Sequence, residues 1–99
     1  MDLNRQLKTA ISSGELTFGQ NQTIDACANG NAKLVIFAAN CPQDYIDSLR
    51  ARHPDVPMHR IELVNRELGA ACAKPFSIST ICVLNEGNSE LLTLSPNLD

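Results

Sequence analysis

Hydrophobic residues recur at helical spacing in four separate segments of the chain. In the first, Leu3, Leu7, Ala10 and Ile11 stand at positions i, i+4, i+7 and i+8, which is typical of the buried face of an amphipathic helix. The remaining stripes are Ile24, Cys27 and Ala28, then Tyr45, Ile46 and Leu49, and last Val64, Leu68, Ala71 and Cys72. We expect these helices to end at Ser12-Ser13-Gly14, at Asn29-Gly30, before His53-Pro54 and before Pro75.

The segment 34–39 is hydrophobic at every position. A strand that is apolar on both faces belongs in the middle of a sheet that helices cover on both sides. Further strands are predicted at residues 16–18, 56–61 and 78–84, and residues 85–88 have the composition of a turn. Because strands and helices alternate, we predict an α/β fold, a three-layer α/β/α sandwich around a mixed, roughly four-stranded sheet.

The composition favours one globular domain over residues 1–99, since 43% of the residues are hydrophobic and 19% are charged. The net charge is −3 and there is no run of basic residues, which argues against non-specific binding to nucleic acid. The longest apolar run, residues 34–39, is too short to cross a membrane, and residues 1–5 lack the pattern of a secretory signal. We therefore expect a cytoplasmic protein with no membrane partner.

The chain contains four cysteines, Cys27, Cys41, Cys72 and Cys82. They include no Cys-x-x-Cys pair and have no histidine cluster beside them, so we predict buried free thiols, no metal site and no cofactor. A Walker loop and a Ser/His/Asp order are also missing, and Asp44 and Asp47 fit a solvated helix face better than a catalytic pair. We therefore predict no catalytic residues and no enzymatic activity.

The segment Gly19-Gln20-Asn21-Gln22-Thr23 follows a predicted strand and opens a predicted helix without any charged residue. Two interpretations are open. In the first, Asn21 or Thr23 simply caps the helix. In the second, Gly19 lets a ligand approach the backbone, the first amide N–H groups suit a phosphate, and the Asn and Gln side chains present donors and acceptors that can read base edges.

Two further loops adjoin predicted strands. Asn40 directly follows the central strand, at the carboxyl end where ligands gather in open α/β sheets, although a role as a turn residue or helix cap also explains it. Phe76 follows Lys74-Pro75 between the last helix and the last strand. On such a loop the ring either stacks on an unpaired base or packs into the core.

Four segments, taken in order, resemble a known family: "LTFGQNQTIDA", "AKLVIFAANCP", "RELGAACAKPFSIS" and "NEGNSELL". The chain is similar to the archaeal and eukaryotic L-thirty-e group of large-subunit ribosomal proteins, within the kink-turn RNA-binding superfamily. The resemblance implies a non-catalytic constituent of the large ribosomal subunit, in the cytoplasm. It also implies kink-turn ribosomal RNA and other large-subunit ribosomal proteins as partners.

The resemblance further implies a set of RNA-binding residues. In that family the helix-opening segment meets the sheared guanine–adenine pairs of the kink-turn, and the asparagine after the central strand contacts RNA. The loop after Lys-Pro-Phe lies against flipped-out nucleotides. Carried over to this chain, the expected RNA-binding residues are Gly19, Gln20, Asn21, Gln22, Thr23, Lys33, Asn40, Lys74, Phe76, Ser77 and Ile78.

Two features depart from the family pattern. Asp25 stands where family members commonly carry a basic residue, and the chain is acidic overall. Fewer phosphate contacts should weaken RNA binding. Three explanations are open: a surface adapted to high intracellular salt that keeps Lys33, Arg50, Arg52 and Lys74 near the RNA, support from neighbouring ribosomal contacts, or a paralogue that has lost RNA binding. A small-ligand or redox domain that uses the same sheet edge and the four thiols is the alternative function.

Overall fold

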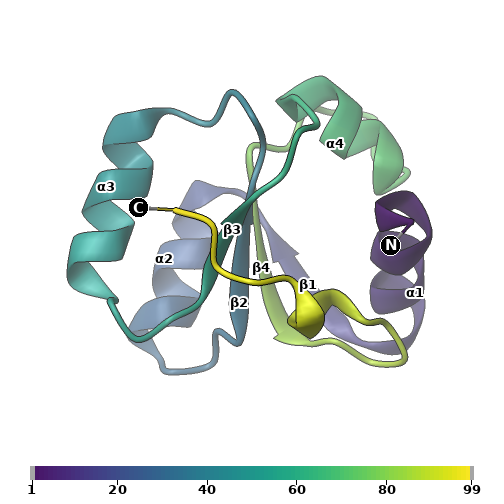
Figure 1. Cartoon of the computed structure of the whole chain (residues 1–99). Coiled ribbons are helices and arrows are strands. Elements are labelled where there is room, and N and C mark those ends of the chain that lie inside the picture. Colours follow the sequence, from purple (N-terminus) through teal and green to yellow (C-terminus); the bar gives the residue numbers. More distant parts are fainter. Residues whose placement is uncertain (1, 99) are drawn as a thin grey trace.

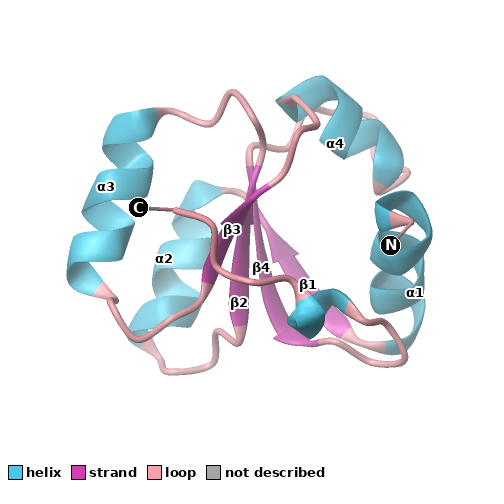
Figure 2. Cartoon of the chain, in the orientation of Figure 1, coloured by secondary structure: helices cyan, strands magenta, loops and turns pink. Residues whose placement is uncertain are grey.

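The computed structural model describes residues 2–98. Its elements are α1 (Leu3–Ser13), β1 (Glu15–Phe18), α2 (Gln20–Ala28), β2 (Leu34–Phe37), α3 (Gln43–Arg52), β3 (Met58–Arg60), α4 (Asn65–Ala71), β4 (Thr80–Asn85) and the short 3-10 helix η1 (Leu91–Thr93). The four strands form one sheet in the order β1-β4-β2-β3, in which β2 and β3 are parallel and β4 is antiparallel to both of its neighbours. Helices α2 and α3 cover one face of the sheet, and α1 and α4 cover the other (Figure 1, Figure 2). The predicted α/β/α sandwich with a mixed four-stranded sheet is confirmed.

Strand β2 links the two hydrophobic cores. All of its residues are buried, and they alternate between two clusters of side chains. Leu34 and Ile36 pack with residues of α1 and α4, whereas Val35 and Phe37 pack with residues of α2 and α3. Successive side chains of a strand point to opposite faces, so a strand that is apolar at every position fits between two helical layers.

Each predicted helix and strand is present, with ends that differ from the prediction by at most three residues. The strand predicted at 56–61 is shorter because Pro57 has no N–H to donate, and β3 begins at Met58. The strand predicted at 34–39 ends at Phe37. The N–H of Ala38 donates to the carbonyl of Ser79, which precedes β4, and the N–H of Ala39 donates to the carbonyl of Leu63, which lies beyond the end of β3.

The direction of the strands brings several loops to one end of the sheet. Strands β1, β2 and β3 run the same way and β4 runs the opposite way. The carboxyl ends of three strands and the amino end of β4 therefore share one end, which is uppermost in Figure 1. Helices α2, α3 and α4 each begin there, after the loops that follow β1, β2 and β3. We call this the carboxyl end of the sheet.

The connection from α4 to β4 runs close against α4 at Gly69. A Cβ atom on Gly69 would lie 2.0 Å from the carbonyl oxygen of Phe76, so only glycine permits this approach. The carbonyl of Gly69 also accepts hydrogen bonds from the N–H groups of Cys72 and Lys74, at 3.2 and 2.9 Å. Between them Ala73 has a φ of 57°, a left-handed conformation that costs a non-glycine residue about 1–2 kcal/mol. The path of the chain into Phe76 is thus strongly constrained.

Residues 94–98 pass along the outer edge of β3 (Figure 1). The N–H of Arg60 donates to Oδ1 of Asn97 at 2.7 Å, and Nδ2 of Asn97 donates to the carbonyl of Arg60 at 2.7 Å. Nδ1 of His59 also lies 2.6 Å from the carbonyl oxygen of Ser95. The Asn97 amide makes the pair of bonds that a neighbouring strand would make, and so it covers the open edge of the sheet.

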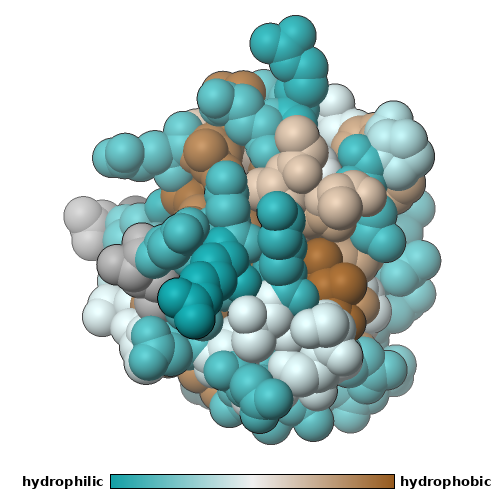
Figure 3. Space-filling model, turned by 90° about the vertical axis from the view of Figure 1, so that its right-hand side faces the viewer, coloured by the Kyte–Doolittle hydropathy of each residue, from teal (hydrophilic) through white to brown (hydrophobic). Residues whose placement is uncertain are grey.

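The outer surface is polar over much of the molecule. The face over α1 and α4 is mostly hydrophilic, with small and separate hydrophobic areas (Figure 3). Two large hydrophobic side chains are exposed within residues 2–98, Phe76 at 55% and Leu92 at 40%. Within this described part of the chain, no helix has both the length and the apolar character to cross a membrane.

Candidate nucleic-acid interface

Gly19 joins β1 to α2 at the carboxyl end of the sheet. Its φ of 104° and ψ of 160° lie in a region of backbone conformation that is essentially confined to glycine. The N–H of Gly19 donates to the carbonyl of Thr80 at 2.9 Å, which ties the start of α2 to β4. A Cβ atom on Gly19 would meet no other atom within 4 Å. The backbone here is therefore open to close approach by a ligand.

The first turn of α2 presents free polar groups. Three N–H groups, those of Gln20, Asn21 and Gln22, precede the first helical hydrogen bond, which Thr23 donates. The side chains of Asn21 and Gln22 are exposed and make no hydrogen bond with any residue in the range 2–98. A helix start of this kind suits a phosphate, and free amides can pair with the edges of bases.

Gln20 is held by its neighbours. Its Nε2 donates to Oγ of Ser79 at 3.4 Å, and its carbonyl accepts a hydrogen bond from the hydroxyl of Tyr45 at 2.9 Å. Burial raises the pKa of Tyr45 to about 12, so the hydroxyl keeps its proton and remains a donor. Gln20 therefore fixes the start of α2 against α3 and β4, and its side chain is less free than those of the next two residues.

The helix-cap interpretation of this segment is wrong. The N-cap of α2 is Gly19, which makes no side-chain cap, and Asn21 lies inside the first turn. Thr23 is completely buried, and its Oγ1 donates to the carbonyl of Gly19 at 2.8 Å. The expected RNA contact by the Thr23 side chain is therefore excluded in this conformation, because that side chain supports the helix start from inside.

Asn40 lies at the carboxyl end of the sheet, as expected, and joins two loops. Its Nδ2 donates to Oδ1 of Asn65 at 3.0 Å, and its Oδ1 accepts from the N–H of Asn65 at 2.8 Å. The side chain thus caps the first turn of α4 instead of the helix that follows it in sequence. One N–H and one lone pair of the exposed amide remain available to a ligand.

Phe76 projects from the loop between α4 and β4. Its side chain is 55% exposed, so the interpretation of Phe76 as a core residue is wrong. Nearby, Nζ of Lys74 lies 4.9 Å from the centre of the Phe18 ring, a cation–π contact. A hollow of ≈ 400 Å³ brings the loop together with the start of α2, and its lining residues are Phe18, Gly19, Gln22, Phe76, Ser77, Ile78 and Ser79.

The next two residues of that loop differ in access. Ser77 is exposed, whereas Ile78 is only 2% exposed. The N–H of Ile78 also donates to the carbonyl of Asn65 at 3.0 Å. Neither the side chain nor the N–H of Ile78 is available to RNA, so the resemblance overstates its role.

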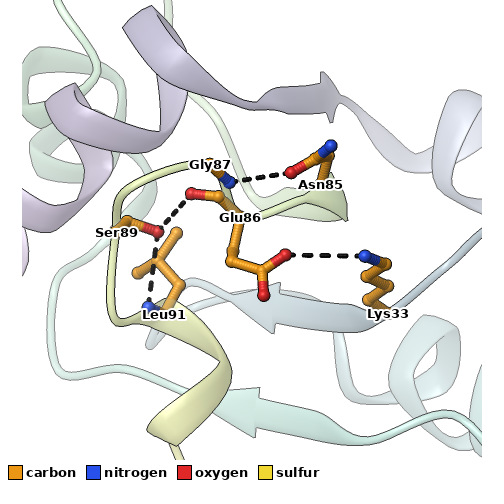
Figure 4. A network of polar contacts seen from close by, with 6 residues as sticks. All are labelled: Lys33, Asn85, Glu86, Gly87, Ser89 and Leu91. Carbon is orange, nitrogen blue, oxygen red and sulfur yellow. Dashed lines mark hydrogen bonds and ion pairs between the residues drawn. The ribbon is translucent and has the colours of Figure 1, made fainter.

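Lys33 lies at the opposite end of the sheet from these residues. It directly precedes β2, about 13 Å from the carboxyl end of that strand at ~3.3 Å per residue. Its Nζ is 3.5 Å from Oε1 of Glu86, in the turn after β4 that Figure 4 shows. The expected grouping of Lys33 with the other RNA-binding residues is therefore wrong.

Arg50 and Arg52 are likewise distant, because they occupy the last turn of α3. Helix α3 begins at the carboxyl end of the sheet and so ends at the other. Nη2 of Arg50 donates to the carbonyl of Leu98 at 3.1 Å. Of the four cations expected near the RNA, only Lys74 lies beside the start of α2.

The cysteines are free and buried, as predicted. Burial raises the pKa of Cys72 to about 11 and that of Cys82 to about 12, and it also raises the pKa of Cys27 and Cys41. The reactive form of cysteine is the thiolate, so raised pKa values leave these thiols protonated and inert at neutral pH. Within residues 2–98 no group of three or more His, Cys, Asp or Glu side chains is placed to hold a metal ion.

We expect thiol reagents to label none of the four cysteines rapidly in the folded protein at neutral pH, and all four after denaturation. Because the folded pKa values lie above the ordinary value of 9.0, the stability that these thiols contribute is complete below that pH and is lost as the pH rises toward 11 and 12. Labelling kinetics with a chromogenic disulfide measure how fast each thiol reacts in the folded and the denatured protein. Rapid reaction of one thiol in the native state would favour the redox alternative.

Comparison with known proteins matches residues 1–93 to the model of the ribosomal protein L7Ae/L30e/S12e/Gadd45 family. The large ribosomal subunit protein eL30 of Methanospirillum hungatei is 41% identical over 96% of this chain and 99% of its own length. The eL30 protein of Methanosphaerula palustris is 38% identical over 95% of this chain and 97% of its own length.

Among solved structures, a Bacillus halodurans protein of unknown function superposes with a TM-score of 0.80 over 93% of both chains. Its sequence identity of 23% supports the fold alone. The family model and the eL30 relatives extend over nearly the whole sequence, and they include every element that forms the carboxyl end of the sheet. This chain therefore belongs to the ribosomal protein L7Ae/L30e/S12e/Gadd45 family.

Proposed function

We propose that this protein is a structural, non-enzymatic constituent of the large ribosomal subunit and acts in the cytoplasm. The relatives described above are named as large-subunit proteins, and they align with this chain over nearly their full length. We also propose that residues 1–99 form a single kink-turn RNA-binding domain, and that its partners are ribosomal RNA and other proteins of the subunit. The RNA would bind at the carboxyl end of the sheet.

The observation that carries the RNA proposal is the juxtaposition of the open start of α2 with the exposed Phe76 loop around one hollow. In this proposal the free N–H groups of α2 receive a phosphate, and the amides of Asn21 and Gln22 pair with base edges. The Phe76 ring stacks on an unpaired base. The proposed interface consists of Gly19, Gln20, Asn21, Gln22, Asn40, Lys74, Phe76 and Ser77.

The acidic charge is compatible with this surface. Asp25 is the sixth residue of α2, about 7.5 Å along the axis from the helix start, close to the distance over which physiological salt screens charges. Because Lys33, Arg50 and Arg52 lie at the other end of the molecule, fewer lysines and arginines would touch phosphates than the sequence led us to expect. Binding would then depend on directed hydrogen bonds and stacking more than on counterion release.

The test is a gel-shift titration of a consensus kink-turn RNA at several salt concentrations, with a fully paired duplex of the same length as the control. We expect specific binding of the kink-turn RNA with a shallow dependence on salt. Equal affinity for the two RNAs would contradict the proposal and would support a paralogue that has lost kink-turn recognition.

Replacing Asn21 by alanine should weaken kink-turn binding by about 1–3 kcal/mol, because truncation leaves a base edge without its hydrogen-bond partner. The matched comparison is Lys33→Ala, which removes a charge at the far end of the sheet and should change the affinity little. Filter binding of both variants measures the difference. Equal losses for the two substitutions would argue against a base-reading role for Asn21.

The alternative of a redox or small-ligand domain has weaker support. Each thiol is buried with a raised pKa, which is unlike the accessible thiolate that redox chemistry needs. The hollow beside Phe76 is bordered by exposed polar residues and does not enclose a ligand on all sides. We therefore favour the RNA-binding function.

A further inference from the structure

Arg60 is the last residue of β3, so it lies at the carboxyl end of the sheet. Its Nη2 donates to Oε1 of Gln43, in the first turn of α3, at 2.6 Å. The side chain is half-buried, and its Nε is buried without a hydrogen-bond partner. No acidic side chain among residues 2–98 forms an ion pair with it. No motif in the sequence marks this residue.

This arrangement leaves a positive charge without a direct counter-charge. Nε2 of Gln43 donates in turn to Oδ1 of Asp47 at 2.9 Å, so that carboxylate is linked to Arg60 only through the neutral amide. An arginine side chain is always protonated, and burying part of a charge costs free energy unless it is paired. The neutral amide of Gln43 satisfies one of five guanidinium N–H groups, and the others include the buried Nε. A cation without a direct ion pair at the proposed binding surface is therefore suited to an anion from outside the protein.

The first turn of α3 places Arg60 next to the proposed interface. Gln43, which holds Arg60, is two residues before Tyr45, whose hydroxyl donates to the carbonyl of Gln20 at 2.9 Å. One helix therefore separates Arg60 from the start of α2, a width of about 10 Å. A nucleic acid seated on the start of α2 would need to extend only across α3 to meet the guanidinium.

We propose that Arg60 binds a backbone phosphate of the same kink-turn RNA, on the side of α3 opposite the start of α2. The inference rests on the proposed function. The planar guanidinium can donate two parallel hydrogen bonds to a phosphate, and Gln43 holds it in position before the RNA arrives. Arg60 and Lys74 thus supply cationic contacts from two separated sides of the interface, in a protein whose other cations lie mostly elsewhere.

The experiment measures the salt dependence of kink-turn affinity for wild type, Arg60→Gln, Arg60→Lys and Arg52→Gln. Loss of one phosphate contact should reduce the slope of log K against log[salt] by about 0.7–0.9. The weakening of binding between 50 and 200 mM salt should then be about threefold smaller for Arg60→Gln than for wild type. Arg60→Lys keeps the charge and should keep the wild-type slope. Arg52→Gln removes an equal charge at the far end of α3 and should also keep it.

The outcomes separate the two proposals. If wild type binds kink-turn RNA specifically but Arg60→Gln has the wild-type slope, the Arg60 inference is overturned and the proposed function stands. If wild type does not distinguish kink-turn RNA from duplex, both the proposed function and the Arg60 inference are overturned. Melting curves establish that the variants are folded. Arg60→Met, which keeps the apolar stem, replaces Arg60→Gln as the neutral variant if the latter does not fold.

Discussion

The Gly69→Ala variant should lose about 3 kcal/mol of unfolding free energy, the upper part of the range for overpacked positions. The added Cβ would lie 2.0 Å from the Phe76 carbonyl oxygen, and that atom belongs to a backbone held by other hydrogen bonds. The loop would have to move away from α4 to relieve this steric clash. In a protein of this size the loss corresponds to a fall in melting temperature of about 12–24 °C.

The direction of this effect is diagnostic. Alanine in place of glycine inside a helix normally stabilises by about 1 kcal/mol, so a large loss can come only from the contact with the loop. The control is Ala73→Gly in the same loop, which relieves a φ of 57° and should raise stability by about 1 kcal/mol. Thermal melts of both variants measure the contrast. A Gly69→Ala protein as stable as wild type would mean that the loop yields freely and that Phe76 is not fixed by α4.

Combining Asn21→Ala with Phe76→Ala should abolish most of the kink-turn affinity. Each substitution is expected to cost about 1–3 kcal/mol, the first through a lost base-edge contact and the second through lost base stacking. The two groups would contact different features of the RNA, so their losses should add to about 2–6 kcal/mol. Even the lower limit corresponds to binding about thirtyfold weaker.

Folding should be nearly unaffected in this double variant. Asn21 is exposed inside a helix, where alanine is the better helix former, and the Phe76 ring is 55% exposed. Leu92→Ala is the matched control, because Leu92 is an exposed hydrophobic side chain in η1, away from the carboxyl end of the sheet. A large fall in melting temperature with unchanged affinity per folded molecule would refute the RNA-facing assignment of Phe76.

The fold could be predicted from the sequence because the hydrophobic patterns of its strands and of its helices are both clear. Leu34 to Phe37 form a strand with no polar face, and residues such as Leu7 and Ala10 recur at helical spacing and are buried. Both patterns arise because buried positions are occupied by hydrophobic residues, and these positions can be read from the sequence. The N-cap of α2 was harder to predict from the sequence. Gly19 takes the N-cap position because of its backbone conformation, without a side-chain hydrogen bond. The pattern of polar side chains therefore drew attention to Asn21 and Thr23 instead.

The candidate site was predictable only in part. The approach of the α2 start to Phe76 depends on β4 pairing between β1 and β2, a non-local feature that local patterns do not encode. One error was avoidable, since Lys33 precedes a strand and so lies at the opposite end from residues that follow it. Arg60 was missed although it ends β3, because an isolated arginine has no motif to mark it.

The position of Asn97 along the chain has a consequence for synthesis. Asn97 follows Arg60 by 37 residues, so the outer edge of β3 is made long before the side chain that covers it. The sheet also needs β4, which ends at Asn85, so the edge stands uncovered only while the 12 residues up to Asn97 are added, about 0.6–2.4 s at ~5–20 residues per second. During this interval the open backbone groups of β3 can pair with another strand, or recruit a chaperone that protects them. Arrival of residues 94–98 closes this edge, so the C-terminal segment protects the new sheet from addition of a foreign strand.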